Sequence, residues 1–119
     1  MEVLIEDRKL IINLATTRNC IKLISFLAKN IKKELPDFEL NDSFKLEDFF
    51  NKNKSKLINM LVACVEDSEE LYNIFLDIAS NCIFNNEKIT ENLLNEKENK
   101  KYFTKIVYNI LLENIKVFF

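Results

Sequence analysis

The sequence predicts an all-α fold, and three observations support that prediction. The chain contains no glycine and a single proline, Pro36, so the two residue types that most often interrupt helices are nearly absent. Primed hairpin turns and left-handed helix caps also depend mainly on glycine. Apolar side chains recur at three- and four-residue spacing over most of the chain, as on one face of a helix. We therefore expect one all-helical domain over residues 1–119, a compact bundle of about five to seven short helices.

The first two helices are expected on either side of a threonine pair. Residues 2–14 carry a ragged apolar stripe, and Thr16-Thr17 supplies the chemistry of a break and a new N-cap. Residues 18–35 carry a clean stripe made of Cys20, Ile24, Leu27, Ile31 and Leu35. This helix should stop at Pro36, because the residue before a proline is pushed out of the α region.

A loop and two further helices are expected next. Residues 36–43 are polar and follow the proline, which indicates a loop. A short helix over 44–51 and another over 55–66 are separated by the polar run 51–56, which predicts a corner.

A longer helix is expected over 68–84. Asp67 followed three residues later by Glu70 is a capping-box pattern, so Asp67 is predicted to cap it. The chain should turn at Asn85-Asn86 and continue as a helix over 87–95. The acidic side chains around Asp67 are explained by their place at a helix N-terminus, where the macrodipole favours negative charge.

The consecutive segments L-I-N-M-L-V-A-C-V-E-D, S-E-E-L-Y-N-I-F-L-D-I-A-S-N-C and N-N-E-K-I-T-E-N-L-L alternate as short helices. This alternation resembles armadillo-type helical repeats, including ataxin-10-like repeats, over residues 57–115. The resemblance implies right-handed stacking of helices, with Asn81 as the asparagine that braces the neighbouring backbone. The chain lacks the glycine usual between helices in that family, and residues 1–50 show no matching period. A non-repetitive bundle is therefore the alternative.

Several kinds of chemistry are excluded by composition. The chain has no histidine, and its three cysteines (Cys20, Cys64 and Cys82) are never in C-x-x-C spacing. The commonest general base, the main zinc ligand and a thioredoxin-like centre are thus missing. Without glycine there is no phosphate-binding loop. We expect no catalytic residues, no metal and no cofactor.

Charge and hydropathy disfavour nucleic acid and membranes as partners. The 17 basic and 19 acidic residues give a net charge of −2, so no strong positive field is available. No apolar run reaches the roughly 20 residues that span a bilayer. Unpaired cysteines and an acidic N-terminal segment predict an intracellular, cytoplasmic protein, in the host cytoplasm if it is viral. A viral regulator with a Bcl-2-like helical fold is a sub-case that helix count alone suggests.

Clustered phenylalanines suggest how such a protein acts. The predicted helix over 44–51 holds Phe44, Phe49 and Phe50, more large apolar side chains than one face of a short helix buries, and the chain ends at Phe118-Phe119. We expect these five residues to bind a protein partner in an apolar groove.

Two alternatives remain open. A homodimer would form if the apolar stripe of the expected helix over 99–117 pairs with a second copy. A weaker single-strand nucleic-acid binder would use lysines with interleaved aromatics.

Overall fold

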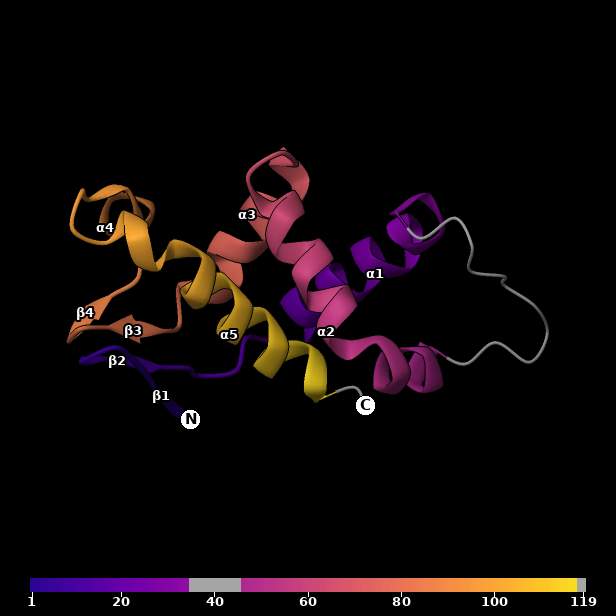
Figure 1. Cartoon of the computed structure of the whole chain (residues 1–119), viewed down its shortest axis with the longest axis horizontal. Coiled ribbons are helices and arrows are strands. Elements are labelled where there is room, and N and C mark those ends of the chain that lie inside the picture. The colour runs from indigo at the N-terminus through magenta and orange to yellow at the C-terminus, as the bar shows by residue number, and fades with distance from the viewer. Residues whose placement is uncertain (35–45, 118–119) are drawn as a thin grey trace.

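The computed structural model describes the backbone of residues 1–34 and 46–117, and the side chains of residues 1–30 and 52–117. Within these residues the chain forms five α-helices and a four-stranded antiparallel sheet (Figure 1). The all-α prediction, with its bundle of helices alone, is therefore wrong, and the fold is mixed.

The N-terminal segment is a β-hairpin where a helix was expected. Strands β1 (Glu2–Ile5) and β2 (Arg8–Ile11) pair through a two-residue turn, with Glu6 at φ 57°. The reason is that burial alternates from one residue to the next, as in a strand. Ile5 and Leu10 are buried, whereas Leu4, next to Ile5, is exposed. Alternation of this kind places apolar side chains on one face of a strand.

A second hairpin replaces the expected helix-to-helix corner. Strands β3 (Ile83–Phe84) and β4 (Glu87–Lys88) are joined by Asn85 and Asn86, whose φ values are 52° and 69°. Two consecutive left-handed residues form the primed turn that suits the twist of a hairpin. Asparagine tolerates this conformation better than other residues with a side chain, so the absence of glycine did not exclude the turn.

The sheet joins segments that are far apart in the sequence. Its strand order is β1-β2-β3-β4, and β2 pairs with β3 through Leu10 opposite Phe84 and Ile11 opposite Ile83. Helices α1 to α3 are inserted between these two strands. The sheet therefore depends on contacts that local sequence patterns do not reveal.

The first two helices follow the sequence closely. Helix α1 (Thr17–Glu34) confirms the helix expected from residue 18, although the predicted stop at Pro36 and the loop over 36–43 lie outside the described residues. Helix α2 (Leu46–Val65) covers both helices expected there. Asn53 lies inside it at non-helical angles (φ −122°, ψ 23°), so the predicted corner is a kink.

Helix α3 (Glu69–Ala79) begins one residue later than predicted and ends earlier. Its N-cap is Ser68, whose Oγ accepts a hydrogen bond from the Leu71 amide at 3.2 Å. Asp67 therefore does not hold the cap position, because the shorter hydroxyl of Ser68 reaches the third amide of the helix.

The C-terminal part contains helix α4 (Glu91–Asn95), a 3₁₀ turn η1 (Lys100–Tyr102) and helix α5 (Phe103–Lys116). Helix α5 packs against α1, α2, α3 and β1, and Figure 1 shows it crossing the molecule between the sheet and the other helices. Its buried apolar residues are Ile106, Val107, Ile110, Leu111 and Ile115. This apolar stripe is therefore buried in the core of the chain itself.

Buried polar contacts tie the two ends of the described chain together. Asn114 is fully buried; its Oδ1 accepts the Ala15 amide at 2.9 Å and its Nδ2 donates to the Ile110 carbonyl at 2.8 Å. The Tyr102 hydroxyl accepts a hydrogen bond from Arg8 at 2.7 Å and donates to Glu6 at 3.2 Å. Helix α5 and the turn before it therefore hold the N-terminal hairpin in place.

Candidate partner-binding surface

The phenylalanines predicted as partner anchors lie outside what the structure describes in full. Phe44, Phe118 and Phe119 are outside the described residues, and Phe49 and Phe50 belong to α2 with their side chains undescribed. Their role in binding a partner stays a prediction.

The residues predicted to have structural roles lie at the two ends of α3, Asp67 and Glu70 at its start and Asn81 after its end. Asp67 is exposed in the turn between α2 and α3, and Glu70 lies in the first turn of α3. Asn81 is exposed just after α3, where its backbone carbonyl accepts a hydrogen bond from the Asn13 side chain at 2.9 Å. Asn81 therefore contacts the segment before α1 through its main chain.

Two adjoining hollows lie between α1, α2 and α3, and we call them together the α1–α3 groove. Their volumes are about 400 and 440 Å³, and both are lined by Phe26 and Glu70, which makes them neighbours. Each falls in the range of roughly 300–1,000 Å³ that is usual for binding pockets. The apolar lining consists of Ile21, Phe26, Met60, Ala63, Cys64 and Ile74.

Helices α1 and α3 position the apolar side chains of the groove. Phe26 and Ile74 are buried at 7% and 8% exposure and form its floor, because they also belong to the core. Ile21 is 50% exposed on α1 and forms a lip. An exposed branched side chain beside a hollow can be buried further by a partner at little entropic cost.

Charged side chains border the groove. Lys29 on α1 and Glu70 on α3 form an ion pair across it at 3.5 Å, with 68% and 56% of their side chains exposed. Such exposed pairs contribute only about 0.2–1 kcal/mol to stability. The pair can therefore be exchanged for contacts with a partner without loss of the fold.

The sequence carried a weak signal for this groove. Ile21 falls outside the stripe that begins at Cys20 and continues through Ile24, so it is an isoleucine on the outer side of an otherwise amphipathic helix. Only the packing of α1 against α3 shows that Ile21 lies next to a hollow.

A second cleft of about 630 Å³ lies on the other side of the α2–α3 turn. Glu66, Asp67 and Glu69 line one wall, and Lys100 stands on another. Tyr72 also lines it; burial raises the pKa of its phenol, and the negative charge of Glu91 and a hydrogen bond to that carboxylate raise it further. Within the part of the chain that the structure describes, no group of three or more candidate ligands could hold a metal ion.

The three cysteines form no disulfide. Burial raises the pKa of Cys20 and that of Cys82, although a hydrogen bond with the Asn13 backbone and the positive charge of the N-terminus lower the pKa of Cys82 in part. A raised pKa keeps both thiols protonated near neutral pH and therefore weakly nucleophilic.

No known protein family, curated protein or solved structure matches this chain. The resemblance of residues 57–115 to armadillo-type repeats accordingly stays a prediction. No helix among the described residues is both long and apolar enough to cross a membrane.

Proposed function

We propose that this chain is a non-catalytic protein–protein interaction module that binds an amphipathic helix of a partner protein in the α1–α3 groove. The observation that carries the proposal is the pair of adjoining hollows that share Phe26 and Glu70, with the half-exposed Ile21 at their lip. Two side chains that project from one face of a helix, three or four residues apart, match two neighbouring hollows.

The charges at the rim indicate how the partner helix is oriented. Lys22 and Lys29 line the groove from α1, whereas Glu70 lines it from α3. A bound helix would place acidic side chains toward α1 and a basic one toward Glu70. Rim charges of this kind affect the rate and specificity of association more than its affinity.

The apolar stripe that was expected to form a homodimer through the C-terminal helix is not exposed. Residues Ile106, Ile110 and Ile115 of α5 are fully buried within the chain, so a second copy could reach them only after partial unfolding. We therefore do not include that dimer in the proposal. An intracellular location remains part of it, supported by three cysteines without a disulfide.

The proposal can be tested with helical peptides selected from a display library against the folded protein. Binding is measured by fluorescence anisotropy, and the contact surface by changes in amide NMR signals. The variant Ile21→Asp should weaken binding at least about tenfold, because it removes apolar burial worth roughly 1–2 kcal/mol and adds a charge to desolvate.

A matched control is Leu14→Asp, because Leu14 is 55% exposed and lines no part of the groove. It should leave the affinity unchanged. Both variants should melt within a few degrees of the natural sequence, since both sites are exposed. Selected peptides that bind equally to the Ile21→Asp variant, or that shift signals only outside the groove, would refute the proposal.

A further inference from the structure

In the part of the chain that the structure describes, the outer edge of β1 carries backbone groups without partners. Met1 and Ile12 exchange two hydrogen bonds, Ile12 N–H to Met1 O at 2.8 Å and the Met1 amino group to Ile12 O at 3.0 Å. In an antiparallel ladder such pairs alternate with pairs that make no mutual bonds. The register then directs the N–H and C=O groups of Glu2 and Leu4 away from β2. Within the described residues nothing else binds these four groups.

This edge is less protected than the opposite one. Strand β4 is two residues long, and both residues, Glu87 and Lys88, are charged and exposed. Short, charged edges of that kind resist the addition of another strand. Strand β1 is four residues long, and its Leu4 side chain is 70% exposed. Strand addition is therefore expected at β1 rather than at β4.

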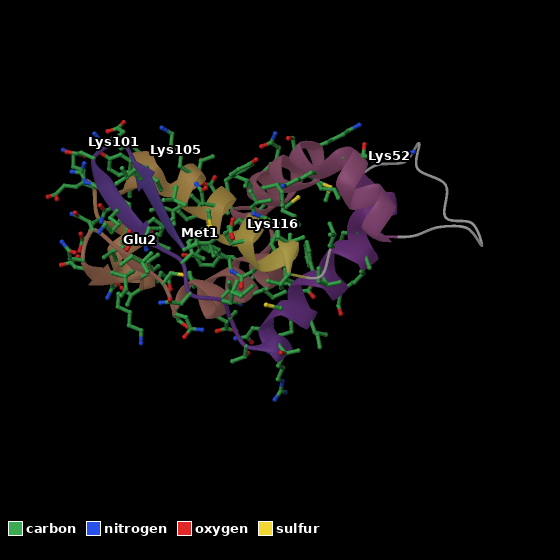
Figure 2. All side chains as sticks on the ribbon, turned by 90° about the horizontal axis from the view of Figure 1, so that it is seen from below. Met1, Glu2, Lys52, Lys101, Lys105 and Lys116 are labelled. Carbon is green, nitrogen blue, oxygen red and sulfur yellow. The ribbon has the colours of Figure 1, made fainter. Side chains whose placement is uncertain are left out.

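Lysine side chains lie along the same side of the molecule. Helix α5 contacts β1, and Figure 2 shows Lys101 and Lys105 at one end of the N-terminal hairpin and Lys116 beyond Met1 at the other. Among the described residues, Lys101 and Lys105 have no carboxylate partner, whereas Lys116 pairs with Glu113 at 3.2 Å. A strand added to β1 would thus lie between Lys101 and Lys105 at one end and the paired Lys116 at the other.

We propose that the free edge of β1 binds an extended, acidic segment of a partner protein by strand addition. The main chain of that segment would form hydrogen bonds with Glu2 and Leu4, and its carboxylates would face Lys101, Lys105 and Lys116. Backbone bonds supply affinity in this mode of recognition, and side-chain charge supplies specificity. This site is separate from the α1–α3 groove and does not depend on it.

A second copy of the chain fits the edge less well. Antiparallel pairing of β1 with itself would bring the α5 lysines of both copies to the same side of one enlarged sheet. Like charges placed together in this way oppose association. An acidic segment satisfies the same hydrogen bonds and neutralises the lysines, so it is the occupant that the charges favour.

The test uses capped eight-residue peptides and the full chain. The probe alternates valine and glutamate; its matched controls alternate valine and lysine, or carry N-methyl groups on the amides that would face β1. We expect the acidic peptide to bind, to shift the amide NMR signals of Glu2 and Leu4, and to bind several-fold more weakly to Lys105→Glu. Both control peptides should bind at least tenfold more weakly.

Variants at Leu4 separate backbone from side-chain recognition. Leu4→Pro removes an outward N–H and should abolish binding, whereas Leu4→Ala keeps the N–H and should retain most of it. Ile21→Asp should have no effect, so failure of the groove leaves this site intact. Equal binding of the N-methylated or lysine-containing peptide would overturn the proposal. So would a dimer that protects the Leu4 amide without peptide, because the occupant would then be a second copy.

Discussion

Replacing Asn114 by alanine tests whether α5 holds the N-terminal part of the chain in place. The Asn114 Oδ1 accepts the Ala15 amide at 2.9 Å and the Cys20 thiol at 3.5 Å, and Nδ2 donates to the Ile110 carbonyl at 2.8 Å. The alanine variant leaves the Ala15 N–H without its acceptor. The Ile110 carbonyl loses little, because it also accepts the helical hydrogen bond four residues later.

The size of the effect follows from these contacts. An unsatisfied donor costs about 1–3 kcal/mol when it is buried, and the Ala15 amide is partly buried; removal of the fully buried Asn114 side chain adds a small cavity. Alanine recovers roughly 0.5 kcal/mol through its higher helix propensity. We therefore expect Asn114→Ala to lower the free energy of unfolding by about 1.5–3 kcal/mol. For a chain of this length that corresponds to a fall in Tm of roughly 5–12 °C.

The assay is urea denaturation at fixed pH, and Asn109→Ala is its matched control. Asn109 lies on the same helix and donates to the Lys105 carbonyl at 2.7 Å, and among the described residues no hydrogen bond joins its side chain to the N-terminal segment. That control should change stability by less than about 0.5 kcal/mol. If both variants cost the same, the long-range contact to Ala15 contributes nothing and the reasoning fails.

Three further predictions concern the turn, the buried tyrosine and the thiols. Asn86→Gly should leave the free energy of unfolding unchanged or raise it. Asn86→Ala should lower it by about 1–2 kcal/mol in chemical denaturation, because alanine is strained at φ 69°. Equal effects of the two variants would contradict a left-handed turn. Tyr102→Phe should lower the free energy of unfolding by about 1–2 kcal/mol, because the Tyr102 hydroxyl accepts a hydrogen bond from Arg8 at 2.7 Å. An unchanged melting temperature would show that this hydrogen bond does not stabilise the fold. Because burial raises the pKa of Cys20 and Cys82 above the ordinary value of 9.0, their thiols ionise first in the unfolded state, so stability should fall as pH rises above about 9. A double alanine variant should reduce that slope in urea titrations, and an unchanged slope would exclude the thiols as its cause.

Helix α1 could be predicted because its signal is local. The stripe through Cys20, Ile24 and Leu27 repeats at helical spacing, and no competing period is present. The kink at Asn53 was likewise marked by a polar run, although the structure keeps both halves in one helix. Local propensity was sufficient for these elements.

The sheet could not be predicted in this way, for two physical reasons. In residues 2–11 the neighbouring apolar residues Leu4 and Ile5 hide the alternation, so a ragged helical stripe fits about as well as a strand. Strand β3 is two residues long and is stabilised by pairing with β2, far away in the sequence. The absence of glycine argued against primed turns, but the asparagines at positions 85 and 86 adopt the left-handed conformation that such a turn requires.

The sequence predicted an apolar groove on the protein, but it did not predict the α1–α3 groove. Sequence reasoning predicted an apolar groove at Phe44, Phe49, Phe50, Phe118 and Phe119, and that prediction stays untested because their side chains lie outside the described residues. The groove that the structure describes is formed where α1 packs against α3, so its position depends on tertiary contacts.

The most direct test of this fold is the Hα–Hα NOE between Leu10 and Phe84. These residues are directly opposite on β2 and β3. The Asn85 amide donates to the Lys9 carbonyl at 2.9 Å, which makes the next pair along the ladder one without mutual hydrogen bonds and therefore close at Cα. We predict a strong cross-peak between the two protons. Its absence, with helical NOEs through residues 2–11, would contradict the sheet and remove the β1 edge as a binding site.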